Sequence, residues 1–104
     1  MKTIEEASRE VADFIQANGG DPLNWYVDVA KDAERRLADI HRVPSTGKRI
    51  QVGCSDADSA RWAAWTLHAE GCSGPPNWSL FPPPPDPAAV QVYAYLKTDG
   101  VTFP

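Results

Sequence analysis

The sequence lacks any long hydrophobic run and contains only two cysteines and two histidines among its 104 residues. No stretch approaches the ~20 consecutive apolar residues that a membrane-spanning helix needs. The N-terminal stretch "MKTIEEASRE" also lacks the apolar core of a secretory signal peptide. These absences predict a cytoplasmic protein, and two free thiols would fit a reducing compartment.

Basic residues are fewer than acidic ones. The chain has 10 lysines and arginines against 14 aspartates and glutamates, for a net charge of −4, and most of the excess falls in residues 1–43. An acidic surface repels DNA and anionic lipid, which argues against direct binding to nucleic acid or membrane. It attracts a basic protein partner, because opposite fields speed association.

The motifs of several enzyme classes are absent. The loop at residues 44–49 lacks most of a phosphate-binding G-x-x-x-x-G-K-[ST] motif, and no G-x-S-x-G, H-E-x-x-H or dinucleotide glycine pattern appears. His68 and Cys72 have i, i+4 spacing, but two ligands are too few for structural zinc. Asp56 and Asp58 suit the capping of a predicted helix better than a divalent ion. We therefore expect no catalytic residues, metal or cofactor.

Cys54 lies where a predicted strand meets the N-terminus of a predicted helix. That position can lower the pKa of a thiol and create a nucleophile, so a small thiol enzyme using Cys54 is an alternative function. His68 is a badly placed base, because it falls about three turns further along the same helix. A disulfide with Cys72 is not expected either, since a helix of about 15 residues keeps its ends roughly 20 Å apart. We expect Cys54 to be a buried structural residue.

Hydrophobic periodicity predicts six elements. Helices are expected at residues 3–18, from Asp21 to before Pro44, and at 56–70, and strands at 49–54, 89–97 and 101–103. The order α-α-β-α-β-β indicates an α+β fold with an α/β-like crossover. It predicts a single domain over residues 1–104, with a small three-stranded sheet and helices on one face.

Local signals mark the ends of these elements. Thr3 and Glu6 fit a capping box at the start of the first helix. Gly19 and Gly20 end that helix, because glycine accepts the left-handed conformation cheaply. Apolar residues at helical spacing predict the second helix, and the dipeptide at residues 99–100, Asp-Gly, predicts a hairpin before the last strand.

One face of the strand at residues 89–97 carries polar and aromatic side chains, namely Gln91, Tyr93, Tyr95 and Lys97. If helices cover only the other face, these side chains are exposed. Tyrosines carry much of the binding energy at protein interfaces. Asp28 and Asp32, in the acidic first half of the chain, would add attraction at longer range. The sequence therefore predicts a partner-binding surface here.

The segment at residues 72–87 holds seven of the ten prolines, and Trp78 and Phe81 stand just before a run of four. Such a segment cannot be a helix or a central strand. We expect a strap whose two aromatics pack against Trp62 or Trp65. Polyproline II segments also dock into grooves of other proteins, so a recruitment arm remains the alternative.

The stretch "RIQVGCSDADSARWAAWTLHAEG", residues 49–71, resembles one half of a SPOR domain, the peptidoglycan-binding fold. That family shows a strand ending in VQVG, a helix with alanines, a leucine and a final glycine. The residues that match are Val52, Gly53, Ala60, Leu67 and Gly71. The resemblance implies a glycan-binding module as a further alternative.

Taken together, these features predict a small, acidic, non-enzymatic protein-binding module. Bacterial or phage inhibitors of the immunity-protein or anti-CRISPR type have this size and charge. A basic, nucleic-acid-handling protein would be the matching target, because its field complements an acidic surface.

Overall fold

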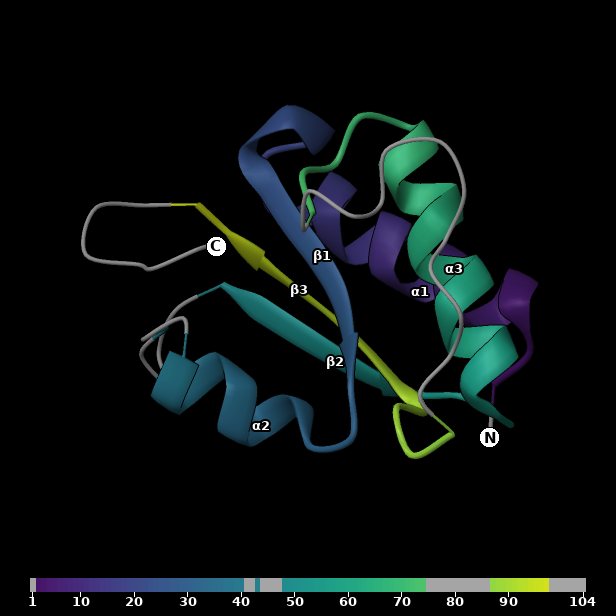
Figure 1. Cartoon of the computed structure of the whole chain (residues 1–104). Coiled ribbons are helices and arrows are strands. Elements are labelled where there is room, and N and C mark those ends of the chain that lie inside the picture. Colours follow the sequence, from purple (N-terminus) through teal and green to yellow (C-terminus); the bar gives the residue numbers. More distant parts are fainter. Residues whose placement is uncertain (1, 41–42, 44–47, 75–86, 98–104) are drawn as a thin grey trace.

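The computed structural model describes residues 2–40, 43, 48–74 and 87–97. Its centre is a three-stranded sheet of β1 (Trp25–Ala30), β2 (Arg49–Gly53) and β3 (Gln91–Leu96). The strands lie in the order β1-β3-β2, and both outer strands run antiparallel to β3 (Figure 1). The predicted α+β class with a small three-stranded sheet is confirmed.

Helix α1 (Ile4–Ala17) begins and ends close to its predicted bounds. Thr3 Oγ1 accepts a hydrogen bond from Glu6 N at 3.3 Å, and the Glu6 carboxylate accepts one from Thr3 N at 3.1 Å. Hydrogen bonds from the Thr3 backbone and side chain stabilise the ionised carboxylate and lower the pKa of Glu6. At the other end, Gly20 has a φ of 80° and donates its N–H to Ile15 O at 2.9 Å. The capping box and the glycine stop signal are both confirmed.

The second predicted helix is wrong for most of its length. The chain instead forms a 3-10 turn (Pro22–Asn24), β1, then α2 (Ala33–Arg35), which continues as a π-helical stretch (Arg36–Ile40). We refer to residues 33–40 as the α2 segment. The run "WYVDV" is aromatic and β-branched, which suits a sheet. Because β1 is buried on both faces, it lacks the alternation that would have revealed it.

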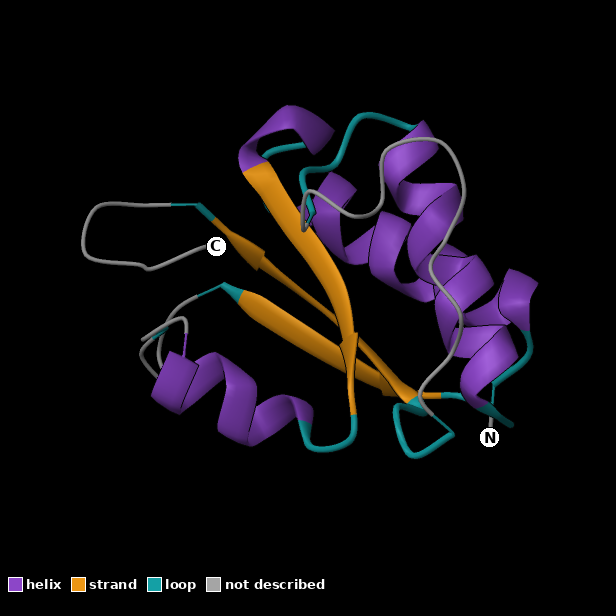
Figure 2. Ribbon diagram, in the orientation of Figure 1, coloured by secondary structure: helices purple, strands orange, loops and turns teal. Residues whose placement is uncertain are grey.

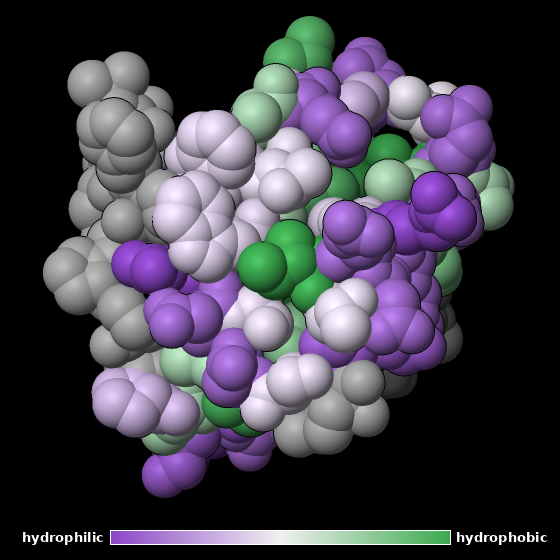
Figure 3. All heavy atoms as spheres, turned by 90° about the vertical axis from the view of Figure 1, so that its right-hand side faces the viewer, coloured by the Kyte–Doolittle hydropathy of each residue, from purple (hydrophilic) through white to green (hydrophobic). Residues whose placement is uncertain are grey.

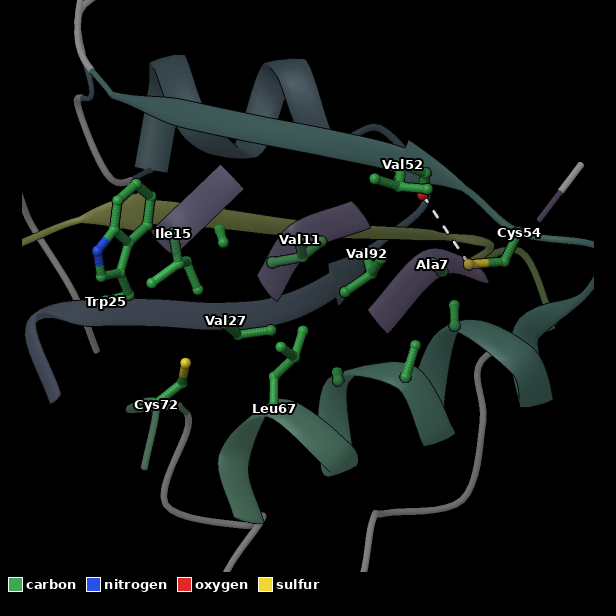
Figure 4. Close-up of a cluster of buried hydrophobic side chains, with 14 residues drawn as sticks. Ala7, Val11, Ile15, Trp25, Val27, Val52, Cys54, Leu67, Cys72 and Val92 are labelled. Atoms are coloured by element: carbon green, nitrogen blue, oxygen red, sulfur yellow. Dashed lines mark hydrogen bonds between the residues drawn. The ribbon is translucent and has the colours of Figure 1, made fainter. Parts of the chain in front are cut away.

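One face of the sheet is covered by α1 and α3 (Ala57–Ala69). Asp56 caps α3 as expected, since its Oδ1 accepts a hydrogen bond from Ser59 N at 2.7 Å. Small alanines let α3 approach the sheet closely, and the resulting core is apolar (Figure 4). We call it the first layer; its buried members are Ala7, Val11, Ile15, Trp25, Val27, Val52, Cys54, Ala60, Ala63, Ala64, Leu67, Cys72, Val92 and Ala94.

The α2 segment covers the face of the sheet opposite to α1 and α3 (Figure 2). The prediction of helices on one face only is therefore wrong. We call the cluster under the α2 segment the second layer; its buried members are Tyr26, Ala30, Ala33, Leu37, Val43, Tyr93 and Tyr95. It is smaller than the first layer and contains three tyrosines.

The predicted α/β-like crossover through α3 is wrong, because such a connection joins parallel strands and β2 and β3 are antiparallel. Strand β3 is central and is paired on both edges: Leu96 N donates to Lys48 O at 3.0 Å, and Lys97 N donates to Asn24 O at 2.8 Å. The predicted hairpin and final strand at residues 99–103 lie outside the described residues.

Candidate functional site

The predicted tyrosine surface is buried. Tyr93 and Tyr95 are both 0% exposed and lie beneath the α2 segment. Tyr95 stacks on Tyr26, with ring centroids 5.1 Å apart. Burial raises the pKa of all three phenols. The expectation that these rings face solvent is therefore wrong, because the helix predicted over residues 21–43 becomes a strand plus the segment that covers them.

Asp28 is buried in the same layer, with 6% of its surface exposed. Its Oδ2 lies 3.7 Å from Arg36 Nη2, and Tyr93 also hydrogen-bonds its carboxylate. Burial outweighs these favourable contacts and raises the pKa of Asp28 to about 6. The structure thus brings Asp28 and the tyrosines together, but as an internal cluster rather than an exposed surface.

The remaining predicted site residues hold the fold together. Gln91 Oε1 accepts a hydrogen bond from Ala33 N at 2.7 Å and so ties the α2 segment to β3. Asp32 is the N-cap of α2, where its Oδ1 accepts from Arg35 N at 3.2 Å. Lys97 Nζ donates to Ser73 Oγ at 2.7 Å. These contacts give each side chain a structural role, and Asp32 alone of the three is exposed.

Trp78 and Phe81 lie outside the described residues, so the choice between a strap and a recruitment arm stays a prediction. Their expected partners are on α3. Trp62 and Trp65 pack edge to face there, with ring centroids 5.6 Å apart and planes at 71°.

Both cysteines are free and buried. Burial is the main cause that raises the pKa of Cys54, and it raises the pKa of Cys72 to about 12. A raised thiol pKa reduces the thiolate fraction that a nucleophile needs. His68 does not face Cys54 as a base; its Nε2 lies 2.7 Å from Val27 O. Burial therefore works against thiolate formation at Cys54, and the thiol-enzyme alternative stays a prediction.

The described parts of the chain contain neither a cluster of metal ligands nor a membrane-spanning helix. Within residues 2–40, 43, 48–74 and 87–97, no group of three or more metal-ligating side chains occurs. The same ranges contain no helix with both the length and the apolar character needed to cross a bilayer.

A groove with a volume of about 510 Å³ runs between α1 and α3, on their outer side. Hydrophilic side chains gather over much of this face of the molecule (Figure 3). Four of the lining residues are acidic and one is basic. The full lining is Glu5, Glu6, Ser8, Arg9, Ala12, Asp13, Thr66 and Glu70.

A large apolar side chain precedes the groove lining on each helix, next to Glu5 on α1 and one turn before Thr66 on α3. Trp62 and Ile4 are each 37% exposed. Trp62 O accepts a hydrogen bond from Thr66 Oγ1 at 2.9 Å, and Ile4 O accepts one from Ser8 Oγ at 2.8 Å. The Trp62 ring contacts Trp65 edge to face, and the guanidinium carbon of Arg61 lies 5.4 Å from its centroid. Sequence reasoning missed this surface, although the i, i+4 spacing along each helix was visible.

Comparisons with protein families, with curated proteins and with solved structures found no match for this chain. The SPOR resemblance of residues 49–71 therefore gains no support and stays a prediction.

Proposed function

We propose that this protein is a binding module for a protein partner that presents a basic segment, and that the groove between α1 and α3 receives this segment. The observation that carries the proposal is the acidic groove together with the exposed Trp62 and Ile4 that precede it. Acidic residues outnumber the one basic residue in its lining. The chain as a whole is also acidic, with a net charge of −4.

The composition of this surface suits protein recognition. Tryptophan is among the residues that contribute most at interfaces, and a ring already held by its neighbours loses little entropy on binding. Carboxylates around it would pair with lysine or arginine side chains and accelerate encounter. An inhibitor of a nucleic-acid-handling protein would fit this charge, because surfaces that bind nucleic acid are basic.

A charge-reversal experiment tests the proposal. The wild-type chain, the double variant Asp13→Lys/Glu70→Lys and the control Asp39→Lys are immobilised and exposed to an extract of the source cells. Asp39 is a suitable control because its exposed carboxylate pairs with Arg35 in the α2 segment, on the other side of the sheet. We expect one protein to be retained by the wild type and the control, and lost from the double variant.

The purified partner should then bind the wild type at least tenfold more tightly than the double variant, and rising salt should weaken binding. Equal retention on all three surfaces, or binding that salt does not weaken, would contradict the proposal.

A further inference from the structure

The two outer strands of the sheet differ in how their free edges are covered. On β1, Val27 N donates to Ser73 O and Ser73 N donates to Trp25 O, each at 2.8 Å. The Val27 carbonyl also contacts His68 Nε2 at 2.7 Å. The residues that follow α3 thus cover the middle of the β1 edge.

Among the described residues, those that bond to the outer edge of β2 lie at its end. Lys2 N donates to Gly53 O at 3.1 Å, and Ser55 N donates to Lys2 O at 3.0 Å. Earlier in the strand, even-numbered residues bond to β3, as the bonds of Lys48 O and Cys54 N show. In an antiparallel ladder, the residues between them point their N–H and C=O groups away from the partner strand. Arg49 and Gln51 therefore present their backbone groups outward.

Within the described residues, no hydrogen bond reaches the outward backbone groups of Arg49 or Gln51. The Gln51 side chain is exposed and Ile50 is half-buried against the first layer. An uncovered edge is a template for another strand. The free stretch is short, because Lys2 already occupies the edge next to Gly53.

We propose that the β2 edge pairs antiparallel with the β2 edge of a second copy of this chain, about a dyad at Ile50. The outward groups are self-complementary in this arrangement. Arg49 of each copy lies opposite Gln51 of the other, and about four backbone hydrogen bonds form. The two Ile50 side chains meet as an apolar cross-strand pair. An isologous contact of this kind closes as a dimer.

Local charge permits this pairing. Glu34 partly compensates the charge of the Arg49 guanidinium, at 2.7 Å, and Glu10 that of Lys2, at 3.5 Å. The Lys48 residues of the two copies are separated along the strand by about 13 Å, which exceeds the screening length in physiological salt. Because both copies are acidic overall, salt should strengthen the dimer. Salt should instead weaken binding of the proposed basic partner, so each proposal can fail without the other.

Sedimentation equilibrium over a wide concentration range tests the pairing. We expect a monomer–dimer equilibrium in the wild type. Gln51→Pro should abolish the dimer while the chain stays folded, because the missing N–H points away from β3 and proline is tolerated at such edge positions. Gln51→Lys should weaken the dimer at least threefold by placing like charges opposite each other, and Gln51→Glu should strengthen it.

Matched substitutions at an exposed residue of α1, Gln16→Lys and Gln16→Glu, control for net charge. The variant Ile50→Cys should form an intermolecular disulfide on mild oxidation, because Cα atoms facing each other at the dyad are about 4.5 Å apart. A wild-type chain that stays monomeric throughout would overturn the proposal. A dimer that responds to the Gln51 and Gln16 changes alike would overturn it too. The same holds for a dimer whose Ile50→Cys variant forms no intermolecular disulfide.

Discussion

The two faces of the sheet carry cores of different chemistry. The first layer, under α1 and α3, is built mainly from alanines and valines, with one isoleucine, one leucine, one tryptophan and two cysteines. The second layer, under the short α2 segment, contains three tyrosines around a buried aspartate. The first is therefore stabilised mainly by the removal of apolar surface from water. The second depends in addition on hydrogen bonds and on the charge state of Asp28.

The largest expected difference between the layers comes from truncating one leucine in each. Leu67 and Leu37 are both 1% exposed. Leu67→Ala should lower the free energy of unfolding by about 4 kcal/mol, because the helices and sheet around it cannot close the cavity. Leu37→Ala should cost about 2 kcal/mol, because the short α2 segment can open locally and limit the loss.

Denaturant unfolding measures both losses, and hydrogen exchange locates them. Leu37→Ala should speed exchange in residues 33–40 and leave α1 and α3 protected. Equal losses with exchange spread over the whole chain would mean that the two layers form a single cooperative core.

A smaller effect, of opposite sign, is expected at Asp28. The folded-state pKa of about 6 lies above the ordinary value for aspartate, so the folded state binds the proton more tightly than the unfolded state. This group therefore stabilises the fold at low pH, and its contribution is lost as pH rises from about 4 to about 6. Asp28→Asn should raise the free energy of unfolding at pH 7 by about 2 kcal/mol, because an uncharged side chain avoids the cost of burying the carboxylate.

Thermal unfolding at pH 4 and at pH 7 checks this sign. The gain from Asp28→Asn should be present at pH 7 and absent at pH 4. The conservative control Asp39→Asn changes an exposed carboxylate in the α2 segment and should alter stability little at either pH. If Asp28→Asn destabilised the protein at pH 7, the ion pair with Arg36 would outweigh burial.

The sequence was most informative for the first layer. The capping box of α1, the cap at Asp56, the alanine stripe of α3 and the strands at β2 and β3 follow from local patterns. Each pattern reflects an element with one buried face or a side chain that satisfies its own helix end. Local signals were sufficient there because the elements are long or clearly bounded.

The second layer could not be predicted in the same way. Leu23, Tyr26, Val27 and Ala30 also fit helical spacing, so periodicity alone could not separate β1 from a helix. Once β1 is a strand, the chain between it and β2 supplies the segment that buries Tyr93 and Tyr95. The acidic groove was missed because it forms between two helices that are distant in sequence.

The smallest effect is expected at Cys54, in the first layer. It tests whether this buried thiol is unreactive, whereas the charge state of Asp28 in the second layer is expected to change stability. Cys54 is 0% exposed, and burial raises the pKa of its thiol. Cys54→Ala should lower the free energy of unfolding by about 1 kcal/mol, from lost burial, and leave partner binding unchanged. A thiol reagent should label Cys54 and its matched control Cys72 only after denaturation. Rapid labelling of Cys54 in the folded protein, while Cys72 stays protected, would instead favour the thiol-enzyme alternative, because burial protects both sulfurs alike and only an activated thiolate would distinguish them.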